Sequence, residues 1–197
     1  MRVDWSTLSD GDLAALSLAG RQPAFAEILR RYRAPVFRVA RAWTGEADEA
    51  LDIVQETFVA AHRALGRYDG ARAMQAWLST IALNKCRDWA RRRAVRRFLS
   101  FGFDHATQAE TVAHDAVAID DEAADRQELD RVTRAIATLP DTLKTPLILH
   151  TIDGLPQAEV AALLGISAKA VETRIYRARA ALTEKLREDQ GDRGRSA

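Results

Sequence analysis

The fold of this chain is decided by the stretch LPQAEVAALLGISAKAVETRIYRARAAL, residues 155–182. Pro156 suits the first turn of a helix, because its fixed φ is already helical and its missing N–H is not needed there. Gly165 suits the left-handed residue that ends this helix, and the Ser167 hydroxyl can cap the next one. Two helices joined by a short turn that contains glycine form a helix-turn-helix.

The second of these helices has two different faces. Its apolar stripe should pack inward and consists of Val171, Ile175, Ala178 and Leu182. The rest of its surface carries side chains that can hydrogen-bond with base edges and phosphates in a major groove. Together with the capping serine, the expected DNA-contacting set is Ser167, Lys169, Glu172, Thr173, Arg174, Tyr176, Arg177 and Arg179. An ordinary helical hairpin with a solvated basic face is the alternative. The spacing of Ala161 and Val171 around Gly165 favours a DNA-reading unit.

The composition is ordinary for a soluble protein of one or two small domains, with 197 residues, 47% of them hydrophobic and 29% charged. No stretch approaches the roughly 20 apolar residues of a membrane-spanning helix, so we expect no direct membrane insertion. The N-terminus MRVDW lacks the apolar segment of a signal peptide. The single cysteine, Cys86, excludes an internal disulfide and a thiolate cluster. We therefore expect a cytoplasmic protein.

The formal net charge of +1 hides a strong segregation of charge. Residues 84–97 contain seven basic side chains and one acid, whereas residues 104–128 contain eight acids and one arginine. Blocks of like charge are typical of partner-facing surfaces or flexible connectors.

Helical periodicity runs through both halves of the chain. Ser9 or Asp10 can cap a short first helix, and Pro35 should kink or break the helix that follows. A third helix over 47–65 should bury Leu51, Val54, Phe58, Ala61 and Leu65. A helix that begins near Arg126 should bury Leu129, Val132, Ile136 and Leu139.

These patterns predict an all-α protein with two small helical domains and a flexible acidic linker. The N-terminal domain should span residues 1–97 and the linker residues 98–126. The C-terminal domain, which carries the helix-turn-helix, should span residues 127–187 and be followed by a disordered tail over 188–197.

Several motifs in order resemble one family. DIVQETF at 52–58 is followed by AWL at 76–78, Asn84, and RRR at 91–93. In the C-terminal half, LLGIS at 163–167 agrees as well. Together they resemble bacterial RNA polymerase sigma factors of the sigma-70 type, and most closely the two-domain extracytoplasmic-function group.

The resemblance covers roughly residues 12–93 and 128–186. It implies an alternative sigma factor that binds core RNA polymerase and directs promoter-specific transcription initiation at minus-10 and minus-35 elements. The implied partners are core polymerase (mainly the β′ coiled coil, and also β), promoter DNA and an anti-sigma factor, all in the bacterial cytoplasm. We expect no enzymatic activity, cofactor or metal.

The resemblance also assigns residues. The core-polymerase contacts it implies are Asp52, Gln55 and Glu56. Melting of the minus-10 element needs a pocket with an aromatic wall and base-edge donors, flanked by cations for phosphates. The implied set is Arg67, Tyr68, Asp69, Asn84, Arg87, Arg91, Arg92 and Arg93. The chain departs from the family pattern at five positions. Leu51 replaces an acid, Met74 and Gln75 replace Phe-Arg, Leu83 replaces an arginine, and Glu172 replaces a lysine or arginine.

Two other functions compete with this hypothesis. A freestanding helix-turn-helix transcription regulator would need a dimer surface to match a palindromic site, and no heptad pattern supplies one. A polymerase-binding helical adaptor would not need the two basic faces at 84–97 and 169–179.

Overall fold

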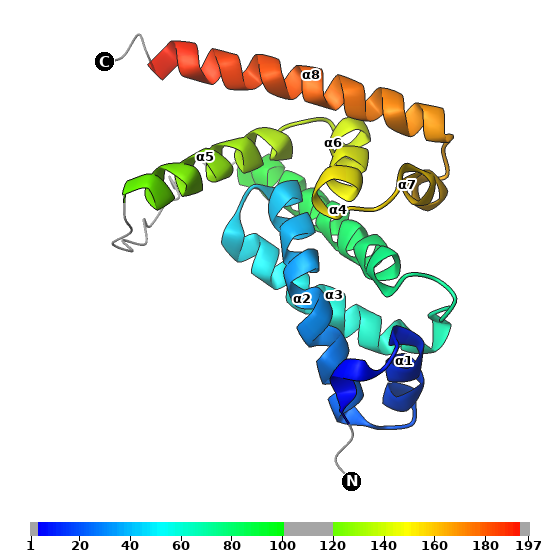
Figure 1. The fold of residues 1–197 in the computed structure, drawn as a ribbon. Coiled ribbons are helices and arrows are strands. Elements are labelled where there is room, and N and C mark those ends of the chain that lie inside the picture. Colours follow the sequence, from blue (N-terminus) through cyan, green and yellow to red (C-terminus); the bar gives the residue numbers. More distant parts are fainter. Residues whose placement is uncertain (1–3, 101–119, 194–197) are drawn as a thin grey trace.

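The computed structural model describes residues 4–100 and 120–193, with side chains for residues 4–99 and 125–189. Within these ranges every regular element is a helix, which confirms the all-α fold (Figure 1). The α-helices are α1 (Asp10–Leu18), α2 (Gln22–Thr44), α3 (Ala47–Ala64), α4 (Met74–Ser100), α5 (Asp120–Ala137), α6 (Asp141–Leu147), α7 (Gln157–Leu164) and α8 (Ala168–Arg193). The short elements are the 3-10 turns η1 (Trp5–Thr7) and η2 (Leu65–Arg67) and the π-helical η3 (Ile148–Ile152).

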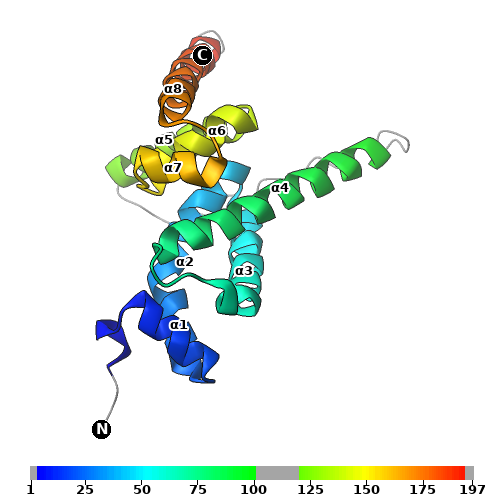
Figure 2. The ribbon, with the colours of Figure 1, turned by 90° about the vertical axis from the view of Figure 1, so that its right-hand side faces the viewer.

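Helix α2 is the centre of the N-terminal half, where it packs against α1, α3 and α4 (Figure 2). Side chains from three helices are fully buried between them, among them Ile28, Val39, Ile53 and Leu78. At the far end of α2, the buried Trp43 meets Trp89 of α4 edge to face, with ring centroids 6.4 Å apart.

The sequence predicted a kink or break at Pro35; α2 does not break there, because it runs through this residue as one helix. A proline inside a helix costs about 3 kcal/mol. Ile28 before it, and Val36 and Val39 after it, are buried against the core. Burial of each such side chain contributes about 1.5–3 kcal/mol, which outweighs the cost of the proline.

In the C-terminal half, α8 lies across α6 and α7 and also contacts α5 (Figure 1). Its core includes the fully buried Ile148, Leu149, Val160 and Val171. Helix α2 extends this core, because it also packs against α5 and η3. The buried apolar side chains of both halves therefore form one continuous cluster.

Two predicted core residues lie at the surface instead. Leu51 is 39% exposed and Leu129 is 66% exposed. The buried stripe of α3 consists of Ala50, Ile53, Val54, Thr57, Phe58 and Ala61. Leu51 falls at the edge of that stripe, and Leu129 falls at the corresponding edge of the buried stripe of α5.

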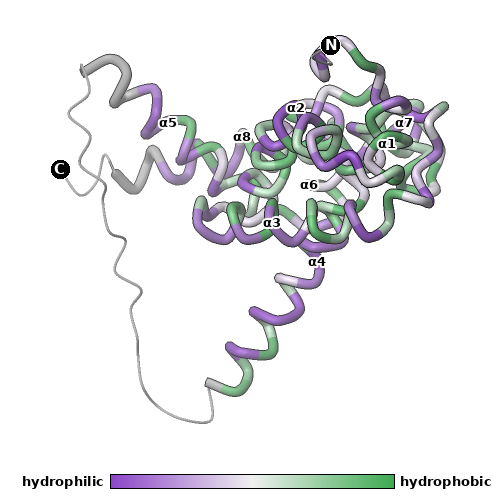
Figure 3. Tube along the Cα trace, turned by 90° about the horizontal axis from the view of Figure 1, so that it is seen from below, coloured by the Kyte–Doolittle hydropathy of each residue, from purple (hydrophilic) through white to green (hydrophobic). Residues whose placement is uncertain are grey.

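The helices extend further than the sequence patterns indicated. Helix α4 ends at Ser100, and its C-terminal part projects from the rest of the molecule (Figure 3). Helix α5 begins at Asp120 and α8 reaches Arg193. The early start of α5 has a simple physical reason, because three acids follow one another at 120–122 and acidic residues favour a helix N-terminus. Residues 101–119 and 194–197, and with them most of the predicted linker and the end of the predicted tail, lie outside the described residues.

A charged cluster fixes the N-terminus of the chain to α2. The Arg31 guanidinium donates to the Asp10 carboxylate at 3.1 Å and to the Glu27 carboxylate at 2.9 Å. It also donates to the backbone carbonyls of Trp5, Ser6 and Leu8. Arg30 donates twice to the same Glu27 carboxylate, both at 2.7 Å. The hydrogen bonds from these two arginines lower the pKa of Glu27 to about 2.

This cluster makes stability depend on acid pH. The pKa of Glu27 is lower in the folded protein than in the unfolded chain, so its stabilising contribution is complete above about pH 4.5 and is lost as the pH falls towards 2. Glu27→Gln should therefore lower the free energy of unfolding at pH 7 and flatten its decline between pH 4.5 and 2.5. Urea denaturation across this range checks both effects, with Glu184→Gln on the exposed surface of α8 as the control. Parallel pH profiles for Glu27→Gln and the unsubstituted protein would contradict the prediction.

Candidate nucleic-acid and polymerase interfaces

The helix-turn-helix forms through the capping interactions that its sequence predicted. Gly165 ends α7 in the left-handed region with φ of 64°, and the N–H of Ile166 donates to the Ala161 carbonyl at 3.1 Å. The Ser167 hydroxyl then accepts a hydrogen bond from the N–H of Ala170 at 3.1 Å, which caps α8. The predicted inward residues Val171, Ile175 and Ala178 are buried. Helix α8 is thereby fixed with its opposite face toward solvent.

The outward face of α8 is less basic than its composition suggests. Lys169 and Glu172 form an ion pair, with Nζ and Oε2 2.8 Å apart. The Thr173 hydroxyl donates to the Lys169 carbonyl at 2.8 Å, so only its acceptor capacity is left for a ligand. Tyr176 is 74% exposed. The net positive charge of this face comes from Arg174, Arg177 and Arg179.

The loop before α4 is built around Tyr68. Its ring packs against Trp77 with centroids 5.2 Å apart, and its hydroxyl donates to the Arg72 carbonyl at 2.6 Å. Burial raises the pKa of Tyr68. Asp69 accepts a hydrogen bond from the backbone of the turn at 3.0 Å, so its carboxylate stabilises the loop. Arg67 and Asp69 are exposed, whereas Tyr68 is half-buried and supports the loop from inside.

On α4 the structure brings Asn84 and Arg87 together. Arg87 Nη1 donates to Asn84 Oδ1 at 3.2 Å, and the Asn84 side chain is exposed. The arrangement places an amide and a guanidinium side by side on the solvent face of one helix. Such a pair can hydrogen-bond with a base edge and a phosphate at the same time.

Of the three arginines at 91–93, only Arg91 lies on that face, because it follows Asn84 by seven residues and Arg87 by four. Each forms an ion pair with a different acid: Arg91 with Asp88, Arg92 with Glu56, and Arg93 with Glu46. Arg93 also lies over the Trp89 ring at 5.1 Å. Arg92 and Arg93 therefore face α3 and its N-terminus, and only Arg91 pairs within α4.

The three residues expected to contact core polymerase also differ from one another. Asp52 and Gln55 are exposed on α3. Glu56 is half-buried and lies 3.6 Å from Lys85 Nζ and 3.2 Å from Arg92 Nη2. Its carboxylate joins α3 to α4, so Asp52 and Gln55 are the freer members of the set.

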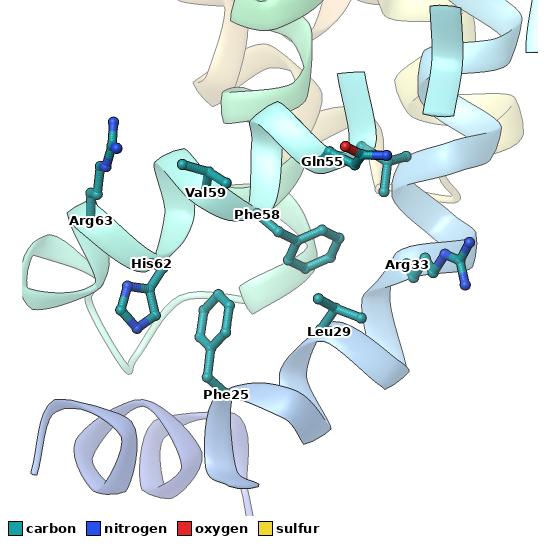
Figure 4. Close-up of a pocket in the computed structure, with 9 residues that line it drawn as sticks. Phe25, Leu29, Arg33, Gln55, Phe58, Val59, His62 and Arg63 are labelled. Atoms are coloured by element: carbon teal, nitrogen blue, oxygen red, sulfur yellow. The ribbon is translucent and has the colours of Figure 1, made fainter. Parts of the chain in front are cut away.

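An apolar groove that sequence reasoning missed lies beside Gln55, between α2 and α3. It has a volume of about 580 Å³. Figure 4 shows Phe25 and Leu29 of α2 facing Phe58 and His62 of α3, with Gln55 at one end. Leu29 is 38% exposed and Val59 is 51% exposed. The signal in the sequence was Val59, an apolar residue on the otherwise polar outward side of the helix that follows Ala47.

Neither a cluster of metal ligands nor an activated thiol is found in the described part of the chain. No three metal-ligating side chains gather among the described residues. Cys86 is buried, and burial raises the pKa of its thiol to about 12, so it is not poised as a nucleophile. No helix among the described residues is both long and apolar enough to cross a membrane.

Comparisons with known proteins match both halves. The family model for Sigma-70 region 2 matches residues 28–96, and that for Sigma-70, region 4 matches residues 129–182. These two regions define the chain as a sigma factor of the sigma-70 type.

Individual relatives place it more closely. The chain is 40% identical to the RNA polymerase sigma factor CnrH of Cupriavidus metallidurans, over 92% of this chain and 96% of that protein. It is 31% identical to the ECF RNA polymerase sigma factor SigW of Bacillus subtilis, over 86% of this chain and 92% of that protein. A solved structure of CnrH in complex with the cytosolic domain of CnrY matches with a TM-score of 0.67 at 36% identity, over 91% of this chain and 98% of that one.

The chain belongs to the extracytoplasmic-function group of the sigma-70 family. It is an alternative sigma factor, which directs RNA polymerase to promoters and initiates specific transcription. The two competing functions, a freestanding regulator and a helical adaptor, are not favoured.

Proposed function

We propose that the two halves of the chain divide promoter recognition between them. Residues 1–97 dock on core polymerase and recognise and melt the minus-10 element, and residues 127–187 recognise the minus-35 element. Residues 98–126 connect them, and residues 188–197 form a tail. One observation carries this proposal: a single chain presents two separate exposed polar faces, at Asn84 on α4 and at Arg177 on α8.

The docking face for polymerase is the outer side of α3 together with the α2–α3 groove. Asp52 and Gln55 supply polar contacts, and Leu29 and Val59 supply apolar surface that is exposed in the free protein. A polar rim around an apolar centre is the usual anatomy of a protein interface. The resemblance to the family points to the β′ coiled coil as the partner, with further contacts to β, and the ridge of a coiled coil would fit a groove between two helices.

The minus-10 face combines the loop around Tyr68 with the exposed surface of α4. Asn84 supplies an amide for the edge of an extruded base, and the Tyr68–Trp77 pair supplies an aromatic wall. Arg67 in the loop and Arg87 and Arg91 on α4 supply positive charge for the flanking phosphates. Arg92 and Arg93 contribute only after exchanging their present carboxylate partners for phosphates.

The minus-35 face is the outer surface of α8. Its arginines hold the duplex through phosphates and base edges, and Glu172 accepts from a cytosine amino group if the Lys169 pair opens. Ser167 lies at the N-terminus of the helix, where its backbone neighbours suit a phosphate.

A protein anti-sigma factor controls the activity. The support is the solved complex of the related CnrH with the cytosolic domain of CnrY. The structural match between this chain and CnrH spans nearly all of both chains. The site of action is the bacterial cytoplasm, where RNA polymerase works.

Run-off transcription tests the whole proposal. Purified core polymerase with this chain should produce discrete transcripts from fragments of the source genome, and core alone should not. The chain should also co-purify with core. Absence of both promoter-dependent transcripts and co-purification would refute the proposed function.

The docking face can be tested separately. Val59→Asp should weaken the affinity for core polymerase about tenfold or more, because the complex would bury an unpaired carboxylate. Gln55→Ala should weaken it less, and both variants should fold normally because these residues are exposed. Fluorescence anisotropy with labelled protein measures the affinity, and Asp48→Asn in the first turn of α3 is the matched control. Unchanged affinity for both variants would remove this surface from the interface.

The base pocket predicts a selective defect. Asn84→Ala should slow promoter opening about tenfold, the effect of one lost hydrogen bond with a partner in a desolvated pocket, and leave the affinity for core polymerase unchanged. Permanganate reactivity of minus-10 thymines reports opening. Gln55→Ala supplies the reciprocal control, with weaker core binding and normal opening at saturating core. Equal losses of opening and core affinity in Asn84→Ala would contradict the assignment.

A further inference from the structure

A buried carboxylate of the C-terminal half makes its hydrogen bonds with the N-terminal half. Asp153 follows η3 and is 6% exposed. Its Oδ2 accepts from the Ser79 hydroxyl at 2.5 Å, and its Oδ1 accepts from Gln75 Nε2 at 2.7 Å. Gln75 Nε2 also donates to the Asp153 carbonyl at 2.5 Å. Both donors lie on α4, 74 and 78 residues away in sequence.

The surroundings of Asp153 explain why this contact matters. Burial of a carboxylate without hydrogen-bond donors costs several kcal/mol, and here α4 supplies the donors. Burial raises the pKa of Asp153, while the hydrogen bonds from Ser79 and Gln75 oppose that rise. The buried carboxylate of Asp153 is therefore stabilised only while α4 lies against it and supplies these donors.

Further along α4, the contact between the two halves is apolar. Leu83 lies beside Leu163 and Leu164 of α7, where these residues line a small cavity of about 170 Å³ with Thr80 and Arg87. Spaced four apart, one row on α4 consists of Gln75, Ser79, Leu83 and Arg87. We call this row the interdomain stripe. It leads directly to Asn84, because Arg87 donates to that side chain.

A second set of contacts holds the other side of the junction. Arg41 of α2 donates to Asp130 of α5 at 3.0 Å. Lys144 of α6 lies with its Nζ 3.5 Å from the centre of the Trp43 ring. Gly45, which ends α2, leaves no room for a side chain, because a Cβ there would lie 2.9 Å from the Cβ of Ala137. These contacts lie beside the packing of α2 against α5 and η3, so the junction has an α2 side and, at Asp153, an α4 side.

We propose that the interdomain stripe is a docking surface for the chain's own C-terminal half, and that Asp153 holds the free protein closed. In the closed state α7, the first helix of the helix-turn-helix, lies beside the surface that carries Asn84 and Arg87. A partner that needs this surface of α4, or needs the two halves apart, must first break the contact. The contact itself stands independently of the proposed function, and its effect on polymerase binding rests on that function.

Distance measurements in the full chain test the closed state. Spin labels on Gln22→Cys and Thr183→Cys report the separation of the two halves by pulsed electron paramagnetic resonance. The native Cys86 stays unlabelled, because it is buried. The labelled protein should show one narrow distance distribution. Asp153→Ala should add a broad population at other distances and raise the open-to-closed ratio about tenfold or more, since hydrogen bonds to a charged group are lost.

Matched variants show whether the hydrogen bonds are the cause. Gln75→Ala with Ser79→Ala removes the donors from the other side and should open the protein to a similar extent, which also covers the case in which Asp153→Ala fails to fold. Adding the Asp153→Ala change to these two should have little further effect. Glu188→Gln, which removes a negative charge from the exposed surface of α8, should leave the distribution unchanged. A broad distance distribution in the unsubstituted protein would overturn the proposal. So would an unchanged distribution in both Asp153→Ala and the double variant of Gln75 and Ser79.

The consequence for polymerase is measured in the same set of proteins. If only the open form binds core, Asp153→Ala should bind core more tightly, by up to the factor by which its open population rises. Its run-off activity at saturating core should match that of the unsubstituted protein. A chain that closes as described but supports no transcription would refute the proposed function and leave the closed state standing. A chain that supports transcription but shows no closed state would refute the closed state and leave the proposed function standing.

Discussion

The burial of α2 is the constraint on which the other interfaces depend. This helix of 23 residues packs against α1, α3 and α4 and also reaches α5 and η3 of the other half. Because the apolar stripes of α3 and α4 both pack against α2, only the opposite faces of these helices remain for partners. Val59 on α3 and Asn84 on α4 lie on those remaining faces. The surfaces proposed for polymerase docking and for base recognition are thus separated by the same packing that stabilises the fold.

The features that depend on local periodicity could be predicted from the sequence. The left-handed Gly165, the capping Ser167 and the buried Val171 follow from residue type and spacing alone. The contacts of Asp153 with α4 could not be predicted in this way, because they join residues more than 70 positions apart and involve ordinary polar side chains. The groove at Leu29 depends likewise on how far apart two helices lie, which a periodic pattern does not determine.

Ion pairs explain how a chain of net charge +1 can still bind nucleic acid. Arg92 and Arg93 pair with acids near α3, and Lys169 pairs with Glu172, all at sites that are largely open to water. Such exposed pairs contribute about 0–1 kcal/mol each. Phosphates can replace these carboxylates at little cost, so the pairs reduce unspecific attraction to DNA without preventing a correctly placed contact. A low net charge is also what we expect of a protein that binds DNA as part of a complex with polymerase.

Two of the departures from the family pattern are explained by contacts at the junction of the two halves. Gln75 and Leu83 are two of the five departures, and both belong to the interdomain stripe, where one donates to Asp153 and the other lies beside Leu163. An arginine at either position would bring a positive charge and a longer side chain to a contact that now consists of an amide donor and an aliphatic surface. The same stripe ends at Arg87, beside Asn84, so the proposed closing contact and the proposed base-reading residue share one helix. The hydrogen bonds of Asp153 form the α4 side of a junction that also includes the packing of α2 against α5 and η3. Release of the C-terminal half by polymerase therefore requires an interface that replaces both contacts.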